Sequence, residues 1–109
     1  MFVHFDTRMG NCEIGVWAEA AGQGRGLFSA AVRRLLDYAL IERGMHRAEW
    51  ITSTVNLRSR AVAERLGMTL DGVLREWYPF NGVRHDKEVW SMLAPEWRKL
   101  RGSEGSESA

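Results

Sequence analysis

The chain has 109 residues, of which 45% are hydrophobic and 27% charged, and its formal net charge is +1. This composition is typical of one soluble globular domain, and the charge gives no reason to expect a nucleic acid or a membrane as the main partner. Cys12 is the only cysteine and the three histidines are far apart in sequence, so we expect neither a disulfide framework nor a metal site. No apolar run approaches the roughly 20 residues of a membrane span and no signal peptide is visible, so a cytoplasmic location is expected.

The first half of the chain predicts a hairpin, a loop and a long helix. Met1–Asp6 and Glu13–Trp17 are expected to be the two strands of the hairpin, and the small, glycine-rich residues 18–25 are expected to form a loop. Phe28–Arg43 is the clearest helix, because its apolar residues recur at helical spacing along one face. Gly44 follows it as a natural left-handed cap.

The next segment predicts a strand followed by a shorter helix. Arg47–Thr54 is rich in Trp, Ile and Thr, as strands often are. Asn56 then stands where it can cap a helix over Leu57–Leu66, which Gly67 ends.

A closing hairpin is predicted after the second helix. Met68–Tyr78 is extended and Arg84–Leu93 is its return strand, because the Asn81-Gly82 pair between them favours a type I′ turn. Pro95-Glu96-Trp97 is expected to begin a final helical turn.

The resulting order β-β-α-β-α-β-β predicts an α+β fold with a mixed central sheet. Strand–helix–strand units imply a parallel contact near the middle of the sheet, and hairpins imply antiparallel pairs around it. A doubly wound Rossmann sheet is not expected. Residues 1–101 are predicted to form the domain, and the small, polar residues 102–109 are predicted to be a disordered tail.

The segment Gln23-Gly24-Arg25-Gly26-Leu27-Phe28 runs directly into the first predicted helix. A helix start presents unpaired N–H groups and partial positive charge, and glycines let a phosphate approach the backbone closely. Arg25 adds a charge-assisted contact. The segment is neither a P-loop nor a dinucleotide fingerprint, and a glycine-rich turn without any ligand is the alternative interpretation.

In its context, after the strand Glu13–Trp17, this segment resembles the Q/R-x-x-G-x-G/A loop of the Gcn5-related N-acetyltransferase (GNAT) superfamily. The similarity is to the RimJ/RimL-like ribosomal-protein-alanine N-acetyltransferase branch. Gln23 and Gly26 match, whereas Phe28 stands at the usually small last position. Three later segments also resemble that branch: Leu35–Ala39 with Gly44–Arg47, the N-x-x-S segment Asn56–Met68, and Leu70–Arg75 with Phe80-Asn81-Gly82 and Asp86.

The resemblance implies an acyl-CoA N-acyltransferase fold that lacks its first strand and first two helices. It implies an N-acetyltransferase that moves acetyl from acetyl-coenzyme A directly to an amine on a protein N-terminus or a small molecule. The alternatives are a catalytically impaired module that binds coenzyme A, and a structural domain without a ligand. Because one side of the sheet would be uncovered, we expect a truncated member or half of a homodimer.

The resemblance also implies a set of site residues. The strand from Ile14 would pair with the pantetheine arm and offer an N–H to the thioester oxygen, and Asn56 would bind a pantetheine amide, although capping its helix competes for that side chain. Ser59 is a candidate to protonate the departing thiolate, and a surface serine is the alternative. Glu13 is the candidate general base, against a plain exposed glutamate. The cofactor-binding set is Ile14, Gly15, Val16, Gln23, Gly24, Arg25, Gly26, Leu27, Phe28, Asn56 and Ser59. Trp77 and Tyr78 either border the acceptor site or lie in the core.

Overall fold

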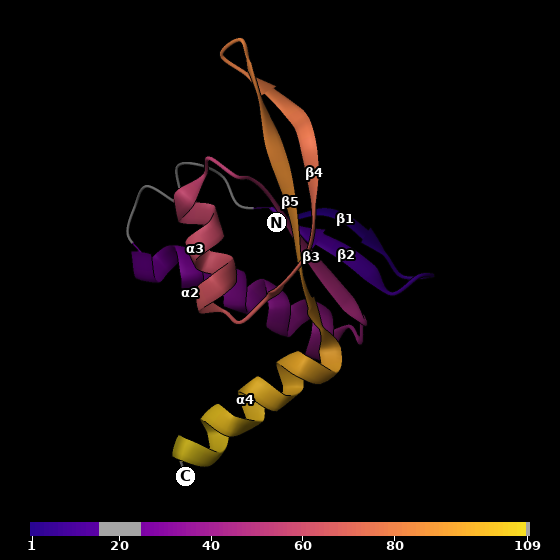
Figure 1. Cartoon of the computed structure of the whole chain (residues 1–109). Coiled ribbons are helices and arrows are strands. Elements are labelled where there is room, and N and C mark those ends of the chain that lie inside the picture. The colour runs from indigo at the N-terminus through magenta and orange to yellow at the C-terminus, as the bar shows by residue number, and fades with distance from the viewer. Residues whose placement is uncertain (16–24, 109) are drawn as a thin grey trace.

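A computed structural model describes residues 1–15 and 25–108, leaving out the side chains of 25–28 and 103–108. It contains a five-stranded mixed sheet in the order β1-β2-β3-β5-β4 (Figure 1). The strands are β1 Phe2–Asp6, β2 Asn11–Ile14, β3 Arg47–Ser53, β4 Thr69–Phe80 and β5 Val83–Leu93. The helices are α2 Arg25–Leu36, which continues as the π-helical η1 Asp37–Glu42, then α3 Leu57–Arg65 and α4 Ala94–Ser108.

The strand pairing confirms the predicted mixed sheet and the predicted element order. β1 and β2 form an antiparallel hairpin, and β2 pairs with β3 in parallel, as expected for strands joined through a helix. β5 lies between β3 and β4 and is antiparallel to both. Asn81 and Gly82 have φ angles of 52° and 75°, which fits the expected type I′ turn between β4 and β5.

The two predicted helix ends are also found. Gly44 and Gly67 have φ angles of 67° and 80°, so each takes the left-handed conformation that ends a helix. The side-chain oxygen of Asn56 accepts a hydrogen bond from the N–H of Ser59 and caps α3.

The predicted boundaries of the first helix and of the strand before it are wrong by a few residues. α2 begins at Arg25, so Arg25, Gly26 and Leu27 form a first helical turn rather than a loop. Glycine weakens helix interiors, but the N–H groups of a first turn have no intrahelical partner in any case, and Gly26 is tolerated there. β2 spans Asn11–Ile14, and the rest of the predicted strand and loop, residues 16–24, lies outside the described residues.

The last helix is longer than the single turn that the sequence indicates, and it runs through the predicted disordered tail to Ser108. Its first turn is anchored, because Trp97 is buried and its indole N–H donates to Asp37 at 2.9 Å. The N–H of Ala94 also donates to the carbonyl of His46 at 2.7 Å. Once a first turn is fixed, each further residue extends a helix at little cost, so a polar segment can follow it.

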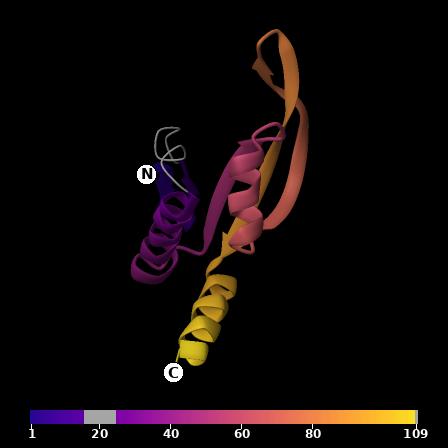
Figure 2. The same cartoon turned by 90° about the vertical axis from the view of Figure 1, so that its left-hand side faces the viewer.

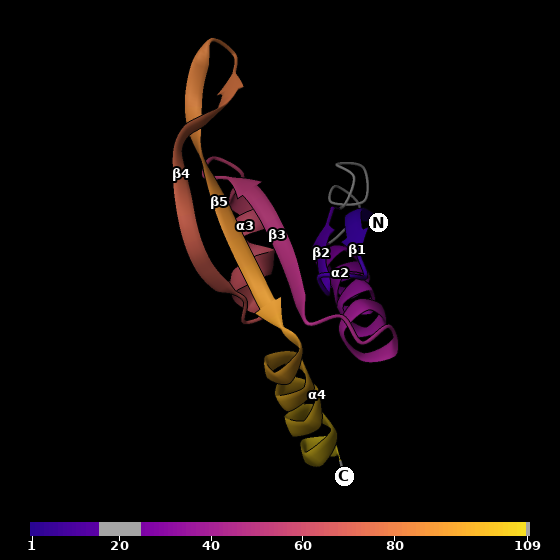
Figure 3. The ribbon, with the colours of Figure 1, turned by 90° about the vertical axis from the view of Figure 1, so that its right-hand side faces the viewer.

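The core lies between the sheet and the helices α2 and α3, which cover the same face (Figure 2). Alternate strand residues point into it, among them Cys12 and Ile14 of β2 and Ala48 and Trp50 of β3. Figure 3 shows the opposite face, over which no described helix lies. The long β4–β5 hairpin extends beyond β3, whose pairing with β5 ends at Ser53. No helix within the described residues has the length and apolar character needed to cross a membrane.

Candidate functional site

The site begins where β2 and β3 separate. Their parallel pairing ends at Ile14 and Trp50, while β3 continues to pair with β5 as far as Ser53. One edge of β3 beyond Trp50 therefore has no strand partner among the described residues, and α3 starts just after it. A cavity of about 730 Å³ opens at this point, within the size range of small-molecule and cofactor sites.

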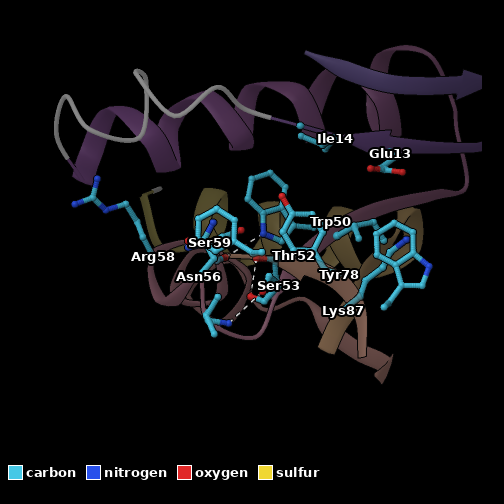
Figure 4. Close-up of a pocket in the computed structure, with 15 residues that line it drawn as sticks. Glu13, Ile14, Trp50, Thr52, Ser53, Asn56, Arg58, Ser59, Tyr78 and Lys87 are labelled. Carbon is cyan, nitrogen blue, oxygen red and sulfur yellow. Dashed lines mark hydrogen bonds between the residues drawn. The ribbon is translucent and has the colours of Figure 1, made fainter. Parts of the chain in front are cut away.

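Several side chains from separate elements meet around this cavity (Figure 4). Five sequence-predicted site residues are among them: Glu13, Ile14, Gly15, Asn56 and Ser59. The other lining residues are Trp50, Ile51, Thr52, Ser53, Val55, Arg58, Trp77, Tyr78, Phe80 and Lys87. Of the remaining predicted residues, Val16, Gln23 and Gly24 lie outside the described part, and Arg25, Gly26, Leu27 and Phe28 are described only as the backbone of the first turn of α2.

The first turn of α3 supplies the polar residues at one side of the cavity. Asn56 is exposed and uses its carbonyl oxygen for the cap, with 3.1 Å to the N–H of Ser59. Capping consumes only an acceptor, so the amide NH₂ keeps its donors for a ligand. Asn56 can therefore cap α3 and bind a ligand at the same time, although the sequence suggested that these two uses compete. Ser59 lies one turn on and is only 8% exposed, so it is not the plain surface serine that the sequence left open.

Trp50 fixes the position of Ser59, and the sequence reasoning missed it. The indole is 4% exposed and its N–H donates to the carbonyl of Ser59 at 3.0 Å, which joins β3 to α3. The sequence did indicate that Trp50 faces inward, because it alternates along β3 with Ala48 and Thr52, which also face inward. The short link after β3 is shaped by further bonds, among them the hydroxyl of Ser53, which accepts from the N–H of Val55 at 3.4 Å.

Glu13 lies on the other side of the cavity from Asn56 and Ser59 (Figure 4). It is the one carboxylate among the described lining residues, and its side chain is 25% exposed. Its Oε1 lies 3.7 Å from Nε2 of His4. Polar donors at one side and a carboxylate at the other give the cavity two chemically different ends.

Gly15 lines the cavity, but its backbone hydrogen bonds go to β1. Its N–H donates to the carbonyl of Met1 at 2.9 Å and its carbonyl accepts from the amino terminus at 3.0 Å. A Cβ on this residue would approach a methyl group of Val3 to 2.9 Å, so a larger residue here would require the side chain of Val3 to move. The N–H expected to face a thioester oxygen is therefore not that of Gly15.

Aromatic side chains of the β4–β5 hairpin form the outer wall of the cavity. Trp77, Tyr78 and Phe80 are between 43% and 52% exposed, so the core position considered for the first two is wrong. Trp77 and Tyr78 stack with centroids 6.4 Å apart. Nζ of Lys87 lies 3.6 Å from the centre of the Trp77 ring, a cation–π contact.

A network of ionisable side chains spans the uncovered face, and the sequence did not predict it. We call His4, Glu13, Glu49, Arg47 and Asp71 the cross-sheet network. Nε2 of His4 is 3.7 Å from Glu13 and 3.9 Å from Glu49, and Arg47 bonds Glu49 at 3.0 Å and Asp71 at 2.7 Å. Hydrogen bonds from Ser91 and from Arg47 hold the pKa of Asp71 below its usual value. Asp71 lies at a bulge in β4, which aims its side chain at the network.

His4, Glu13 and Glu49 bring three metal-ligating atoms within 4.8 Å of one another. The sequence spacing of the histidines gave no sign of this grouping, because it depends on which strands are neighbours. Since Glu49 is already held by Arg47, we assign no metal to it. Cys12 is buried on the other face, and burial, with the nearby Glu49, raises the pKa of its thiol to about 11, which makes it a poor nucleophile.

Comparison with known proteins gives a consistent result. The family model of the acetyltransferase (GNAT) domain matches residues 1–69. Among curated proteins, the chain is similar to the "Putative ribosomal N-acetyltransferase YdaF" of Bacillus subtilis (strain 168), at 38% identity over 85 residues, which make up 78% of this chain and 46% of that protein. The chain thus spans about half the length of the curated relatives it matches.

Two solved structures extend the likeness to three dimensions. The crystal structure of a protein described as "Probable acetyltransferase" has a TM-score of 0.80 and 34% identity, covering 88% of this chain and 54% of the other. The microcin C7 self-immunity acetyltransferase MccE, in complex with acetyl-CoA and AMP, has a TM-score of 0.68 and 32% identity, covering 81% and 49%.

Proposed function

Because this chain belongs to the acetyltransferase (GNAT) domain family, we propose that it transfers an acetyl group from acetyl-coenzyme A directly to a primary amine. The observation that carries the proposal is the cavity at the separation of β2 and β3. Asn56 and Ser59 lie at one side of it and Glu13 at the other. A thioester held between them would meet a proton donor for its sulfur and a base for the attacking amine.

The free edge of β3 supports binding of an extended ligand. Residues after Trp50 lack a strand partner on the β2 side among the described residues, and an extended pantetheine arm can add to such an edge as a strand would. The amide NH₂ of Asn56 would donate to a pantetheine carbonyl. The start of α2 at Arg25 supports pyrophosphate binding by the loop from Gln23, because a helix N-terminus attracts anions.

The chemistry follows from the two ends of the cavity. Glu13 would take a proton from the ammonium group of the acceptor, so that the neutral amine can attack the thioester carbonyl. Ser59 would give a proton to the coenzyme A thiolate as the C–S bond breaks. Positioning alone contributes several kcal/mol to such a transfer, on the order of 7–11 at best.

For the acceptor, we propose a cationic amine on a protein N-terminus or on a small molecule. The carboxylate of Glu13 in the cavity favours a positively charged group, and the exposed rings of Trp77 and Tyr78 offer it an aromatic surface. YdaF, whose name refers to ribosomal acetylation, supports a protein acceptor and the RimJ/RimL-like branch. We place the protein in the cytoplasm.

The second candidate function is binding of coenzyme A without catalysis. It is favoured by the uncovered sheet face beside Glu13 (Figure 3), which leaves the acceptor side open to water. A homodimer that covers the sheet is the arrangement we propose for an active form, because β1 is an edge strand. A stable monomer in analytical ultracentrifugation would count against the dimer.

Two measurements test these functions. Titration calorimetry with acetyl-coenzyme A measures binding, and release of free thiol in the presence of a panel of amines measures transfer. We expect Ser59→Ala to lower kcat by roughly tenfold with little change in cofactor affinity. The matched control is Thr7→Ala, in the exposed turn between β1 and β2. No binding at millimolar cofactor would refute both functions, and binding without transfer to any amine would leave the second.

A further inference from the structure

The cross-sheet network connects the interior of the cavity with bulk solvent. Glu13 lines the cavity and is 25% exposed, whereas His4 beside it on the edge strand β1 is 46% exposed. The cross-strand register places these two side chains opposite each other, and Glu13 opposite Glu49 on β3. A proton that reaches Glu13 from the cavity therefore has an imidazole next to it on the solvent side.

The remaining members of the network hold this arrangement in place. Oε2 of Glu49 accepts two hydrogen bonds from Arg47, at 3.2 and 3.0 Å, which leaves Oε1 facing His4 at 3.9 Å. Arg47 is itself tied to Asp71 on β4. His4 thus lies between two carboxylates, one of which is fixed by an arginine.

We propose that His4 relays the proton released by acetyl transfer from Glu13 to solvent, and so acts as a positioning and relay residue behind the base. This inference rests on the proposed function. Histidine suits the step, because it gains and loses a proton near neutral pH more readily than other side chains. The 3.7 Å between Glu13 and His4 is longer than a direct hydrogen bond, and a small rotation of the imidazole closes it.

The proton balance of the reaction defines what the relay must carry. The acceptor ammonium has three N–H protons and the amide product keeps one. The nitrogen forms a bond to the acetyl carbon, the C–S bond breaks, and the electron pair of that bond leaves on the sulfur. One of the two lost protons ends on the coenzyme A thiol, and the other must leave the site. Each turnover therefore loads Glu13 with one proton that His4 passes to water.

The experiment compares His4→Gln with the control His46→Gln, which alters an exposed histidine that does not line the cavity. For His4→Gln we expect kcat at pH 7 to fall roughly tenfold, less than the loss of a primary base, while KM for acetyl-coenzyme A stays within about twofold. The deficit should shrink as the pH rises, since hydroxide then takes the proton from Glu13. Added imidazole should restore most of the rate in His4→Ala, and a purely structural role of His4 would show no such rescue.

Glu49→Gln is the second variant, and it should show the same pattern more weakly, because it removes only one of the two carboxylates beside His4. Wild-type activity is measured with and without a chelator, so that a metal held by His4, Glu13 and Glu49 would appear as activity lost on chelation and would overturn the relay. An unchanged kcat in His4→Gln, or a deficit in His4→Ala that imidazole does not repair, overturns the relay while leaving acetyl transfer intact. Absence of transfer by the wild-type protein without the chelator overturns both the relay and the proposed function.

Discussion

Glu88 is a buried carboxylate whose removal gives the sharpest test of how α3 is held on the sheet. It lies on β5, is 3% exposed, and its Oε1 accepts from Nε of Arg60 at 3.1 Å and from the indole N–H of Trp90 at 2.9 Å. Because Arg60 belongs to α3, the bond fixes the helix that carries Asn56 and Ser59. The perturbation is Glu88→Ala.

The magnitude follows from the two donors left behind. The indole N–H of Trp90, a residue that is 7% exposed, would be buried without a partner, which costs about 1–3 kcal/mol. The side chain of Arg60 is 35% exposed and regains water, so its share is about 1 kcal/mol or less. Glu88→Ala also removes the cost of keeping a carboxylate out of water, and this gain offsets part of the loss. We expect a loss of about 3 kcal/mol in the free energy of unfolding for Glu88→Ala, and about 1 kcal/mol for Glu88→Gln, which keeps an acceptor oxygen.

Urea unfolding followed by tryptophan fluorescence measures the loss. With an m-value of about 2 kcal/mol/M, a change of 3 kcal/mol moves the midpoint by roughly 1.5 M, and the melting temperature by roughly 10–20 °C. The control is Glu64→Ala on the exposed side of α3, for which we expect a change within about 0.5 kcal/mol. If Glu88→Ala matched that control, the bond would not hold α3. If Glu88→Gln lowered stability as much as Glu88→Ala, an uncharged acceptor oxygen at this position would contribute nothing to the free energy of unfolding.

Three further predictions concern a turn, an ion pair and the thiol. Gly82→Ala should lower stability by about 1 kcal/mol in a thermal melt, because φ is +75° there, whereas Gly72→Ala, with open space and no positive φ, should be nearly neutral. Because the pKa of Asp71 is lowered in the folded protein, its contribution to folding stability is full above the ordinary pKa of 3.8 and is lost as the pH falls through the lower folded-state value. The urea midpoint of the wild-type protein should therefore fall more steeply in acid than that of Asp71→Asn. The difference in stability should be less than about 1 kcal/mol, because this ion pair is partly exposed. With its pKa raised to about 11, Cys12 should react with a thiol reagent at pH 8 only after urea unfolds the protein; rapid reaction of the native protein would contradict its burial.

Local signals in the sequence were sufficient to predict the elements of this fold. Asn56, Gly44, Gly67 and the Asn81-Gly82 pair each act through their own backbone, so their effect can be read without knowing what lies nearby. The end of α4 was missed because its first turn is anchored through Trp97 and Asp37, which are 60 residues apart in sequence. The sequence gives no direct sign of such a contact.

The candidate site was predicted unevenly for a related reason. Asn56 and Ser59 share one helical turn, so spacing alone places them together. Glu88 could have been flagged as an inward charge, since it alternates with Trp90 and Met92 along β5. The contacts of Glu13 with His4 and Glu49 depend on the register of three strands, and a shift of one residue in either pair would send a side chain to the other face.

That same register explains how charged groups come to lie beside a cavity in a small sheet. Along β2 and β3, Cys12, Ile14, Ala48 and Trp50 turn toward the helices, so the alternate residues must occupy the face that no described helix covers. A face in contact with water favours charges there, and the parallel pairing sets Glu13 directly opposite Glu49. Like charges so placed are unfavourable unless a cation lies beside them, and the guanidinium of Arg47 bonds Glu49 at 3.0 Å. The proton path proposed for His4 is therefore made from the groups that let this face of the sheet remain open to solvent.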